Sequence, residues 1–384
     1  MKDESKKMFL IFHGRFPSEK AASLFAAKSA ESFAEQGVPV TLLVPRRISR
    51  EKKAFYDYYD IQKNYKVVFL PVIDLFHIPI ISIFAFHVSI ITFSVSCFFY
   101  LIFRARKDSI IYSNETVPIL LASFLFPRTL IEVHDFPEKK LFLYKMLFSR
   151  VKWILSTNKW KKGKLIQEFK VRDDKIFYEP NAVDVSRFDV SVSKEEAREK
   201  LELLLEKYIV VYTGHLYSWK GVDTLAQATR DLSDDIVVVL VGGVSTDVAR
   251  FKAQYGSIEN LKIVGHREHT EIPYWQKAAD VLILPNTAKE DISKFYTSPM
   301  KLFEYMASKR PIIASKIPSI EELLDETNSI LIEPDNPSVL ATAIKEMINK
   351  KDVAEHISNT AFKNVQNFTW EARARRILAV IKKT

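Results

Sequence analysis

Residues 208–221 read YIVVYTGHLYSWKG, and this stretch indicates the fold of the chain. Its first five residues are apolar or aromatic and predict a strand, Gly214 turns the chain, and Lys220 stands where a helix begins. A strand that leads through a turn into a helix is typical of a parallel α/β sheet. The segment is neither a P-loop nor a dinucleotide-binding fingerprint. A lysine beside the free N–H groups of a helix start nevertheless suits an anion.

The same alternation of strand and helix runs along the whole chain. We expect strands at residues 8–12, 38–44, 66–70, 109–112, 129–133, 153–156, 175–178, 208–212, 236–241, 261–264, 281–284, 311–314 and 329–332. Helices between them are expected at 18–37, 79–103, 118–126, 138–149, 194–206, 221–230, 247–255, 271–278, 299–308 and 369–383, with Ser18 as the cap of the first. The pattern predicts an α/β protein with two Rossmann-like, doubly wound domains facing a central cleft. Ligands of such sheets bind at the carboxyl ends of the strands.

The bulk composition fits a two-domain globular protein. The 384 residues are 47% hydrophobic and 27% charged, which argues against large-scale disorder. The single cysteine, Cys97, excludes an internal disulfide and fits a reducing cytoplasm. The formal charge of +9 favours an anionic partner. Two basic runs, 46–53 and 159–164, are most simply solvated surfaces, and no nucleic-acid-binding signature accompanies them.

The domain boundary is expected just after Glu179 and Pro180. We predict an N-terminal, acceptor-side domain over residues 1–182 and a C-terminal, nucleotide-sugar-binding domain over 183–365. The polar N-terminus lacks the features of a secretory signal.

A long apolar stretch covers residues 75–103, which contain no Asp, Glu, Lys or Arg, and Arg104, Arg106 and Lys107 follow it. Its length is enough for a membrane span. Strands of one predicted sheet flank it, however, and a crossing would separate them. Two alternatives stay open: a helix whose exposed face dips into the membrane interface near anionic headgroups, and a fully buried crossover helix.

A second segment, residues 297–307, reads TSPMKLFEYMA. Ser298 is a good helix cap and Pro299 a good first helical residue, so free N–H groups at this helix start could bind phosphate oxygens. Lys301 and Glu304 share a helix face. By themselves they could be an ion pair on a solvated surface. In a binding site they would be a cation near a diphosphate and a carboxylate on ribose hydroxyls.

Shorter motifs follow other predicted strands. They are Asn181-Ala182-Val183-Asp184 at the boundary, Val241-Gly242-Gly243, and Val264-Gly265-His266-Arg267. Each could be turn chemistry alone. In the first half, His134 and Asp135 follow a strand and face the presumed cleft.

In this order, the motifs resemble those of retaining glycosyltransferases of family 4, the glycogen-synthase-like group with the GT-B fold. The resemblance covers nearly the whole chain and is strongest over 181–315. It implies that Lys220 contacts the diphosphate, that Glu304 binds the ribose and that His134 lies near the transferred sugar. These three are the expected catalytic residues. The resemblance also implies that the last helix, within 366–384, packs back on the first domain.

The donor site implied by the resemblance draws on both segments and on the turns between them. Its expected residues are Gly214, His215, Lys220, Gly243, His266, Arg267, Tyr296, Thr297, Ser298, Pro299, Met300, Lys301 and Glu304. Arg15, His134 and Asp135 are expected on the acceptor side.

Two positions depart from the family pattern. Tyr296 stands where the family often has a sugar-contacting Glu, which puts the sugar and any catalytic carboxylate there in doubt. His215 stands where a basic residue commonly follows the glycine, which would make phosphate binding pH-sensitive because His titrates near neutrality.

The expected function is transfer of a sugar from a nucleoside diphosphate sugar to a glycan or lipid-linked acceptor, with retention of configuration, in surface polysaccharide assembly. No two aspartates are separated by one residue, so the Asp-x-Asp metal motif of the other main transferase fold is absent, and we expect neither metal nor cofactor. The expected location is the cytoplasm, with peripheral membrane contact through 75–107. Two alternatives stay open: a nucleotide-sugar epimerase, and a degenerate, non-catalytic binding protein.

Overall fold

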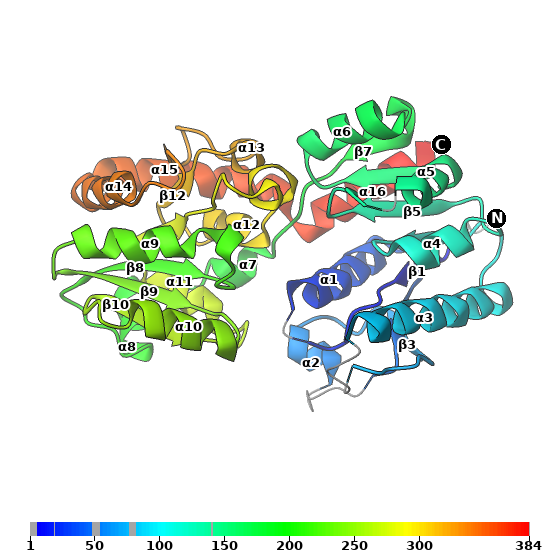
Figure 1. Ribbon diagram of the computed structural model, residues 1–384, viewed down its shortest axis with the longest axis horizontal. Helices are drawn as coiled ribbons and strands as arrows, with labels where there is room; N and C mark the ends of the chain where they lie inside the picture. The colour runs from blue at the N-terminus through cyan, green and yellow to red at the C-terminus, as the bar shows by residue number, and fades with distance from the viewer. Residues whose placement is uncertain (1–5, 19, 48–53, 77–81, 140, 384) are drawn as a thin grey trace. The chain divides into compact units, whose positions relative to one another are not determined.

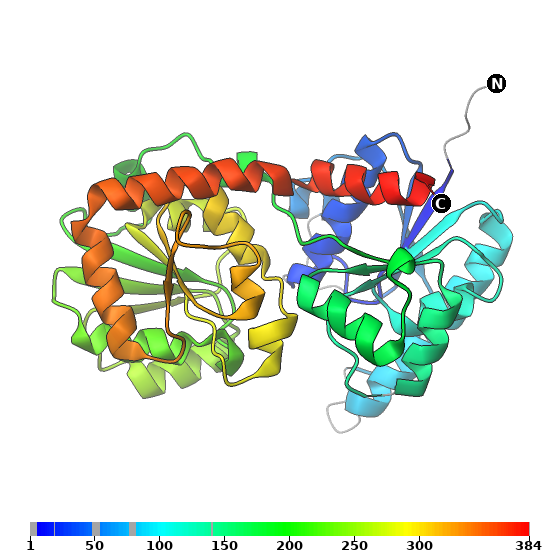
Figure 2. The same cartoon turned by 90° about the horizontal axis from the view of Figure 1, so that it is seen from above.

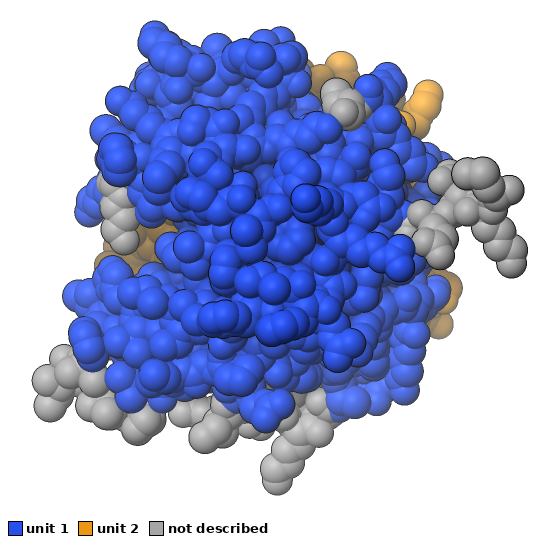
Figure 3. Space-filling model, turned by 90° about the vertical axis from the view of Figure 1, so that its right-hand side faces the viewer, with its two compact units in different colours: residues 1–180, 370–384 blue, residues 181–369 orange. Residues whose placement is uncertain are grey.

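The computed structural model describes residues 6–18, 20–47, 54–76, 82–139 and 141–383. The chain forms two compact units, coloured separately in Figure 3. Unit 1 comprises Met1–Pro180 and Trp370–Thr384, and unit 2 comprises Asn181–Thr369. The described polypeptide therefore passes through unit 2 and returns to unit 1 with its last helix.

Unit 1 is built on a parallel sheet of seven strands in the order β3-β2-β1-β4-β5-β6-β7 (Figure 1). The strands are β1 (Met8–Ile11), β2 (Val40–Pro45), β3 (Lys66–Leu70), β4 (Ile110–Ser113), β5 (Thr129–Val133), β6 (Trp153–Ser156) and β7 (Ile176–Tyr178). The helices are α1 (Ala21–Glu35), α2 (Phe55–Tyr59), α3 (Ser82–Arg104), α4 (Thr116–Ala122), α5 (Leu141–Arg150), α6 (Lys159–Phe169) and α16 (Trp370–Lys383).

Helices cover both faces of this sheet. Phe9 and Ile11 of β1 share a buried core with side chains of α3, α4, α5 and α6. Alternate residues such as Leu10 point to the opposite face because strand side chains alternate. There α1 packs against β2 and against α16.

Unit 2 repeats the architecture with six parallel strands in the order β10-β9-β8-β11-β12-β13. The strands are β8 (Tyr208–Thr213), β9 (Ile236–Val241), β10 (Leu261–Gly265), β11 (Val281–Leu284), β12 (Ile312–Ser315) and β13 (Ile330–Ile332). The helices are α7 (Val185–Phe188), α8 (Lys194–Lys200), α9 (Val222–Ala228), α10 (Ser245–Tyr255), α11 (Ile272–Ala278), α12 (Met300–Ala307), α13 (Pro318–Glu321), α14 (Pro337–Asn349) and α15 (Lys351–Val365). Figures 1 and 2 show helices on both sides of its sheet, and two cores result.

The predicted strands and the α/β fold class are confirmed, but several local predictions are wrong. Ser18 does not cap the first helix, which begins at Ala21 after Lys20; its hydroxyl instead contacts that of Ser23 at 2.8 Å. The run 159–164 is not all solvated surface. It begins α6, in which Lys161 is fully buried and donates to the Val133 carbonyl at 3.0 Å.

Two further sequence expectations fall partly or wholly outside the described residues: the helix start at Pro79 and most of the basic run 46–53. The described part of the long apolar helix, α3, is not fully buried, so that alternative is wrong. Among the described residues, one helix, Ile83–Arg104, is long and apolar enough to cross a membrane. Of the apolar 18-residue stretch within it, 33% is buried.

Candidate active site

The candidate site of unit 2 lies at the carboxyl edge of its sheet. The strand order reverses between β8 and β11, and such a switch point is where doubly wound sheets bind ligands. Gly221, at φ +68°, packs so closely on β11 that a Cβ atom would lie 1.9 Å from the Pro285 carbonyl oxygen. This contact holds Lys220, the last residue of the short 3₁₀ helix Ser218–Lys220, beside the end of β11.

Two lysines meet at this edge. Lys301, on the first turn of α12, is 9% exposed, and its Nζ lies 3.8 Å from the ring centroid of Tyr212. Lys220 is partly exposed, and its Nζ lies 3.7 Å from the Trp219 ring. Burial lowers the pKa of Lys220 to about 7. Burial also lowers the pKa of Lys301 well below its ordinary value, and the nearby Lys220 charge lowers it further.

Neither amine is neutralised by the residues around it. Within the described parts of the chain, the Lys301 amine is buried without a hydrogen-bond partner. No ion pair of Lys220 is found there either. Cations that are buried without an anion are costly, which is why both pKa values fall. The pair is thus an incomplete charge cluster that a bound anion would complete.

Glycine turns bring the ends of β8, β9 and β10 together. The Gly214 N–H donates to the Val241 carbonyl at 2.8 Å, and the Gly242 N–H donates to that of Gly265 at 2.8 Å. A Cβ on Gly214 would lie 3.2 Å from the Lys301 amine, so the absence of a side chain at Gly214 lets this amine approach the backbone. Gly243 has φ +86°, a conformation that favours glycine.

The start of α12 differs from its prediction. Pro299 is the N-cap residue and Met300 the first helical residue, so Ser298 does not cap and Pro299 is not the first helical position. Thr297 and Pro299 are extended, and the Asn181 amide donates to the Ser298 carbonyl at 2.5 Å. The Ser298 hydroxyl is buried without a partner within the described chain. It is therefore available to a ligand, together with the first N–H groups of α12.

Glu304 lies one turn further along α12, and its side chain is 12% exposed. It is not half of a solvated ion pair, because both it and Lys301 are largely removed from water. Burial raises the pKa of Glu304 to about 7, while Arg187, Lys301 and the Gln276 amide oppose this shift. His269 Nε2 lies 3.9 Å from its Oε1.

The remaining predicted donor residues lie around this cluster or at its margin. The His215 ring stacks on Tyr217, with centroids 4.8 Å apart. Tyr296 is buried at the end of a π-helical turn, Ile292–Tyr296. His266 is exposed, and Arg267 bonds the His266 carbonyl at 2.9 Å. Arg267 also faces Glu271 at 3.9 Å, so its guanidinium is engaged beside the turn.

The predicted acceptor-side residues belong to unit 1. His134 follows β5, with Nε2 3.2 Å from Glu132 Oε1 and its ring 4.8 Å from that of Phe25. Asp135 and Arg15 are exposed near the carboxyl ends of β5 and β1.

Sequence reasoning missed a polar cluster at the switch point of unit 1, between β1 and β4. Arg47 Nη2 lies 2.8 Å from His13 Nε2 and donates to Ser89 Oγ at 2.6 Å. The backbone N–H of His13 donates to Glu115 Oε1 at 3.2 Å. Burial lowers the pKa of His13 to about 4 and raises that of Glu115. His13 and Glu115 each follow a strand by two residues, a signal that could have identified them.

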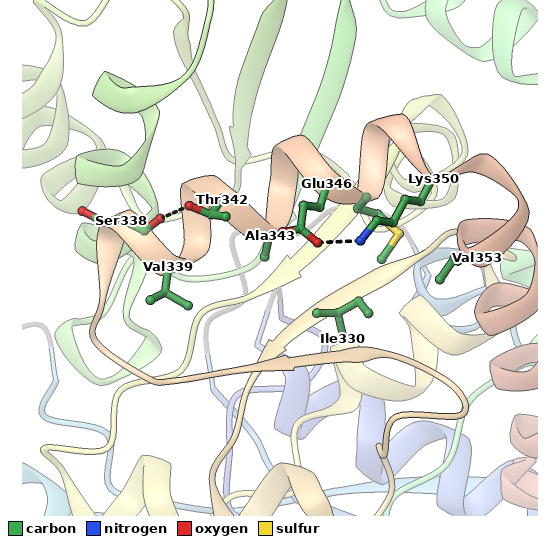
Figure 4. A pocket seen from close by; sticks show the side chains of 9 residues that line it. Ile330, Ser338, Val339, Thr342, Ala343, Glu346, Lys350 and Val353 are labelled. Atoms are coloured by element: carbon green, nitrogen blue, oxygen red, sulfur yellow. Dashed lines mark hydrogen bonds and ion pairs between the residues drawn. The ribbon is translucent and has the colours of Figure 1, made fainter.

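Two other features of the described residues provide no competing site. No group of three or more His, Cys, Asp or Glu in the described residues is arranged to hold a metal ion. A surface hollow of about 460 Å³ lies beside α14, lined by Ile330, Ser338, Val339, Thr342, Ala343, Glu346, Met347, Lys350 and Val353 (Figure 4). No predicted site residue lines it. Its polar side chains form hydrogen bonds with nearby groups; for example, Lys350 Nζ donates to Glu346 Oε2 at 2.7 Å.

Comparison with known proteins identifies the family that part of unit 2 resembles. Residues 207–350 match the family model of the group 1 glycosyl transferases. TuaC of Bacillus subtilis, a glycosyltransferase assigned to teichuronic acid biosynthesis, is 28% identical over 186 residues, 47% of this chain and 44% of TuaC. The D-inositol 3-phosphate glycosyltransferase of Salinispora tropica is 22% identical over 249 residues, 59% of this chain and 50% of its own. The chain thus spans about half the length of these curated relatives.

Solved structures resemble the whole chain. Alr3699/HepE of Anabaena, solved with UDP and glucose, covers 99% of this chain and 100% of its own, with a TM-score of 0.76 and 17% identity. Sucrose-phosphate synthase of Thermosynechococcus elongatus covers 98% of each chain, with a TM-score of 0.79 and 18% identity. Residues 207–350 therefore resemble the group 1 glycosyl transferases, and the whole chain shares the GT-B fold of two Rossmann-like domains with these solved structures.

Proposed function

We propose that the chain transfers a sugar from a nucleoside diphosphate sugar to a hydroxyl of a glycan or lipid-linked acceptor, with retention of configuration. The observation that carries this proposal is the pair of lysines at the switch point of unit 2, whose amines form no ion pair among the described residues. A diphosphate supplies that anion. The names of the relatives, and the UDP bound to Alr3699/HepE, support a nucleotide-sugar donor.

Each residue of the cluster has a role in this reaction. The bond between the anomeric carbon and the diphosphate oxygen breaks, and its electron pair leaves with the diphosphate. The acceptor hydroxyl bonds to the carbon and gives its proton to the departing diphosphate. Negative charge on the diphosphate grows toward the transition state, where preorganised positive charge is most effective. Lys220, Lys301 and the N–H groups at the start of α12 supply that charge. Glu304 accepts hydrogen bonds from the ribose hydroxyls.

Because two lysines and a helix start face the leaving group, we propose that the reaction needs no metal ion. His134 and Asp135 of unit 1 contact the sugar or the acceptor. Assembly of cell-surface polysaccharide at the cytoplasmic face of the membrane is the process proposed. An epimerase is not favoured, because the family model and the curated relatives above are transferases.

The first test is a thermal-shift panel of UDP, GDP, ADP and TDP with their common sugars. A ligand at 100 times its Kd stabilises the folded protein by about 2.7 kcal/mol, which is readily measured. The preferred donor is then incubated with glycan and lipid-linked acceptors, with and without EDTA, and the anomeric configuration of the product is read by NMR. Absence of any nucleotide-dependent shift would refute the proposal. Conversion of the donor without an acceptor would indicate an epimerase, and binding without turnover a non-catalytic protein.

A further inference from the structure

The outer side of α3 is an apolar surface on unit 1. Figure 1 shows this helix at the edge of the unit. We call the apolar face the six large side chains on this side that are at least 42% exposed: Phe84, Ile91, Val95, Phe99, Ile102 and Phe103. Phe84 and Phe103 reach 61% and 79%. Contiguous exposed apolar surface of this kind marks a contact with a partner or a membrane.

The opposite side of α3 is firmly packed. Phe93, Cys97 and Leu101 are at most 1% exposed and share the core with Phe9 and Ile111 of the sheet. Surrounding α3 with lipid would open this core. The helix therefore stays on its sheet and can offer only its outer side, along about 34 Å at 1.5 Å per residue.

The apolar face continues beyond α3 and is bordered by cations. Helix α4 packs against α3, and Phe124 and Leu125 at its end are 53% and 45% exposed. The guanidinium of Arg150 lies 3.7 Å from the Phe124 ring centroid. Exposed Arg104, Arg106 and Lys107 follow α3 directly.

The charge of the chain is concentrated on the same unit. Unit 1 holds 34 of the 56 Lys and Arg but 19 of the 47 Asp and Glu, a formal charge of +15. Unit 2 holds the other 22 and 28, a formal charge of −6. The excess of positive charge thus belongs entirely to the unit that carries the apolar face, and it selects a partner that is both apolar and anionic.

We propose that the apolar face, with Phe124 and Leu125, docks into the interface of an anionic phospholipid bilayer, with α3 lying in the membrane plane. Apolar side chains on one side of a helix insert below the headgroups, and adjacent Lys and Arg are attracted to anionic lipid. The docking uses no residue of unit 2, so it stands or falls separately from the proposed transfer reaction.

The test is vesicle flotation of the full chain with phosphatidylcholine alone and with equal parts of phosphatidylcholine and phosphatidylglycerol. We expect the protein to float with the mixed vesicles, less so with the neutral ones, and to be released by alkaline carbonate. The triple variant Ile91→Gln, Phe99→Gln, Phe103→Gln should lose at least about tenfold in vesicle affinity. The variant Arg104→Gln, Arg106→Gln, Lys107→Gln should lose mainly the preference for anionic lipid.

The matched control is Leu204→Gln, Leu205→Gln in unit 2, where the same type of side chain is 54% and 49% exposed; its flotation should be unchanged. Unaltered circular dichroism of each variant shows that the fold is intact. The proposal is overturned if the wild-type protein stays with the unbound fraction, if the triple variant floats as well as the wild type, or if the protein resists carbonate. A dimer that the triple variant converts to a monomer would assign the face to a second copy instead.

Discussion

Lys220 is one of the side chains that supply positive charge to the proposed reaction. Replacing it by Ala leaves the departing diphosphate without one of its two ammonium groups, so we expect turnover to fall by about two orders of magnitude or more. Steady-state transfer kinetics with the preferred donor measure the change. Lys262→Ala, an exposed lysine on β10, is the matched control and should be neutral. Near-normal turnover of Lys220→Ala would contradict the assignment.

The affinity for nucleotide should depend on pH through the same lysine. With a pKa of about 7 in the free protein, Lys220 is charged below pH 7 and neutral above it. A diphosphate binds the charged form, so binding above pH 7 takes up a proton and affinity falls by up to about tenfold per pH unit. Calorimetric titration across pH 6–9 in buffers of different ionisation enthalpy measures both the affinity and the proton uptake. Lys220→Arg should flatten the profile, because Arg stays charged; an equally steep profile would exclude Lys220 as its source.

The stability of the folded protein should depend on pH through Glu304. Its pKa is raised from 4.5 to about 7, so the folded state binds the proton more tightly than the unfolded state does. The stability that this proton contributes is complete below pH 4.5 and lost as the pH rises through 7. Glu304→Gln should therefore be about 2–3 kcal/mol more stable than the wild type at pH 8 and equal to it at pH 4.5, while binding nucleotide less tightly. Urea unfolding at both pH values checks the difference; equal stability at pH 8 would refute it.

The turn between β8 and α9 depends on Gly221 for its shape. Ala at this position would be strained at φ +68° and would place its Cβ 1.9 Å from the Pro285 carbonyl oxygen, so β8 and β11 could no longer meet as they do. We expect Gly221→Ala to destabilise unit 2 by more than the roughly 1–3 kcal/mol of backbone strain alone. Gly163→Ala is the control. Gly163 lies within α6 with open space around it, so this change should stabilise the protein by about 0.5–1 kcal/mol. Thermal unfolding distinguishes the two; similar melting temperatures would show that the close approach is unimportant.

The strands could be read from the sequence because apolar runs bounded by glycines and polar residues leave few alternatives. The residues at which helices begin could be predicted less accurately from the sequence. Ser18 and Ser298 are good caps by residue type, yet α1 begins three residues after Ser18, and the backbone before α12 stays extended through Pro299. Side-chain preference is local, whereas the start of a helix also depends on its packing.

The residues of the candidate site could likewise be predicted only where they belong to a single motif. The two motifs supply Lys220, Lys301 and Glu304, and the structure brings their charges together at one sheet edge. His269 and Arg187, which act on Glu304, come from other elements, and no spacing in the sequence relates them to it. Burial of Lys161 in an apparently solvated basic run was equally invisible, because its partners are carbonyls on a neighbouring strand. Positions that follow one strand could be predicted; contacts between elements could not.

Because the chain forms two units, its unfolding should resolve into two transitions rather than one. Arg373, on α16, ties the end of the chain to unit 1: its guanidinium lies 2.6 Å from Glu132 and 2.9 Å from the Pro180 carbonyl, and both partners of the ion pair are buried. Removing one partner of a buried pair leaves an uncompensated charge and costs roughly 3–5 kcal/mol. Arg373→Met should therefore lower the transition of unit 1 and leave that of unit 2 unchanged.

The preferred nucleotide should raise the unfolding temperature of unit 2 and leave that of unit 1 unchanged, since every proposed phosphate and ribose contact lies within 181–369. Differential scanning calorimetry of the wild type and Arg373→Met, each with and without nucleotide, gives the four combinations, and hydrogen exchange assigns each transition to its unit. Arg375→Met, whose partner Glu371 is exposed on the same helix, controls for loss of charge on α16. If nucleotide raised both transitions equally, the units would share the binding energy, and the placement of the donor site in unit 2 alone would be wrong.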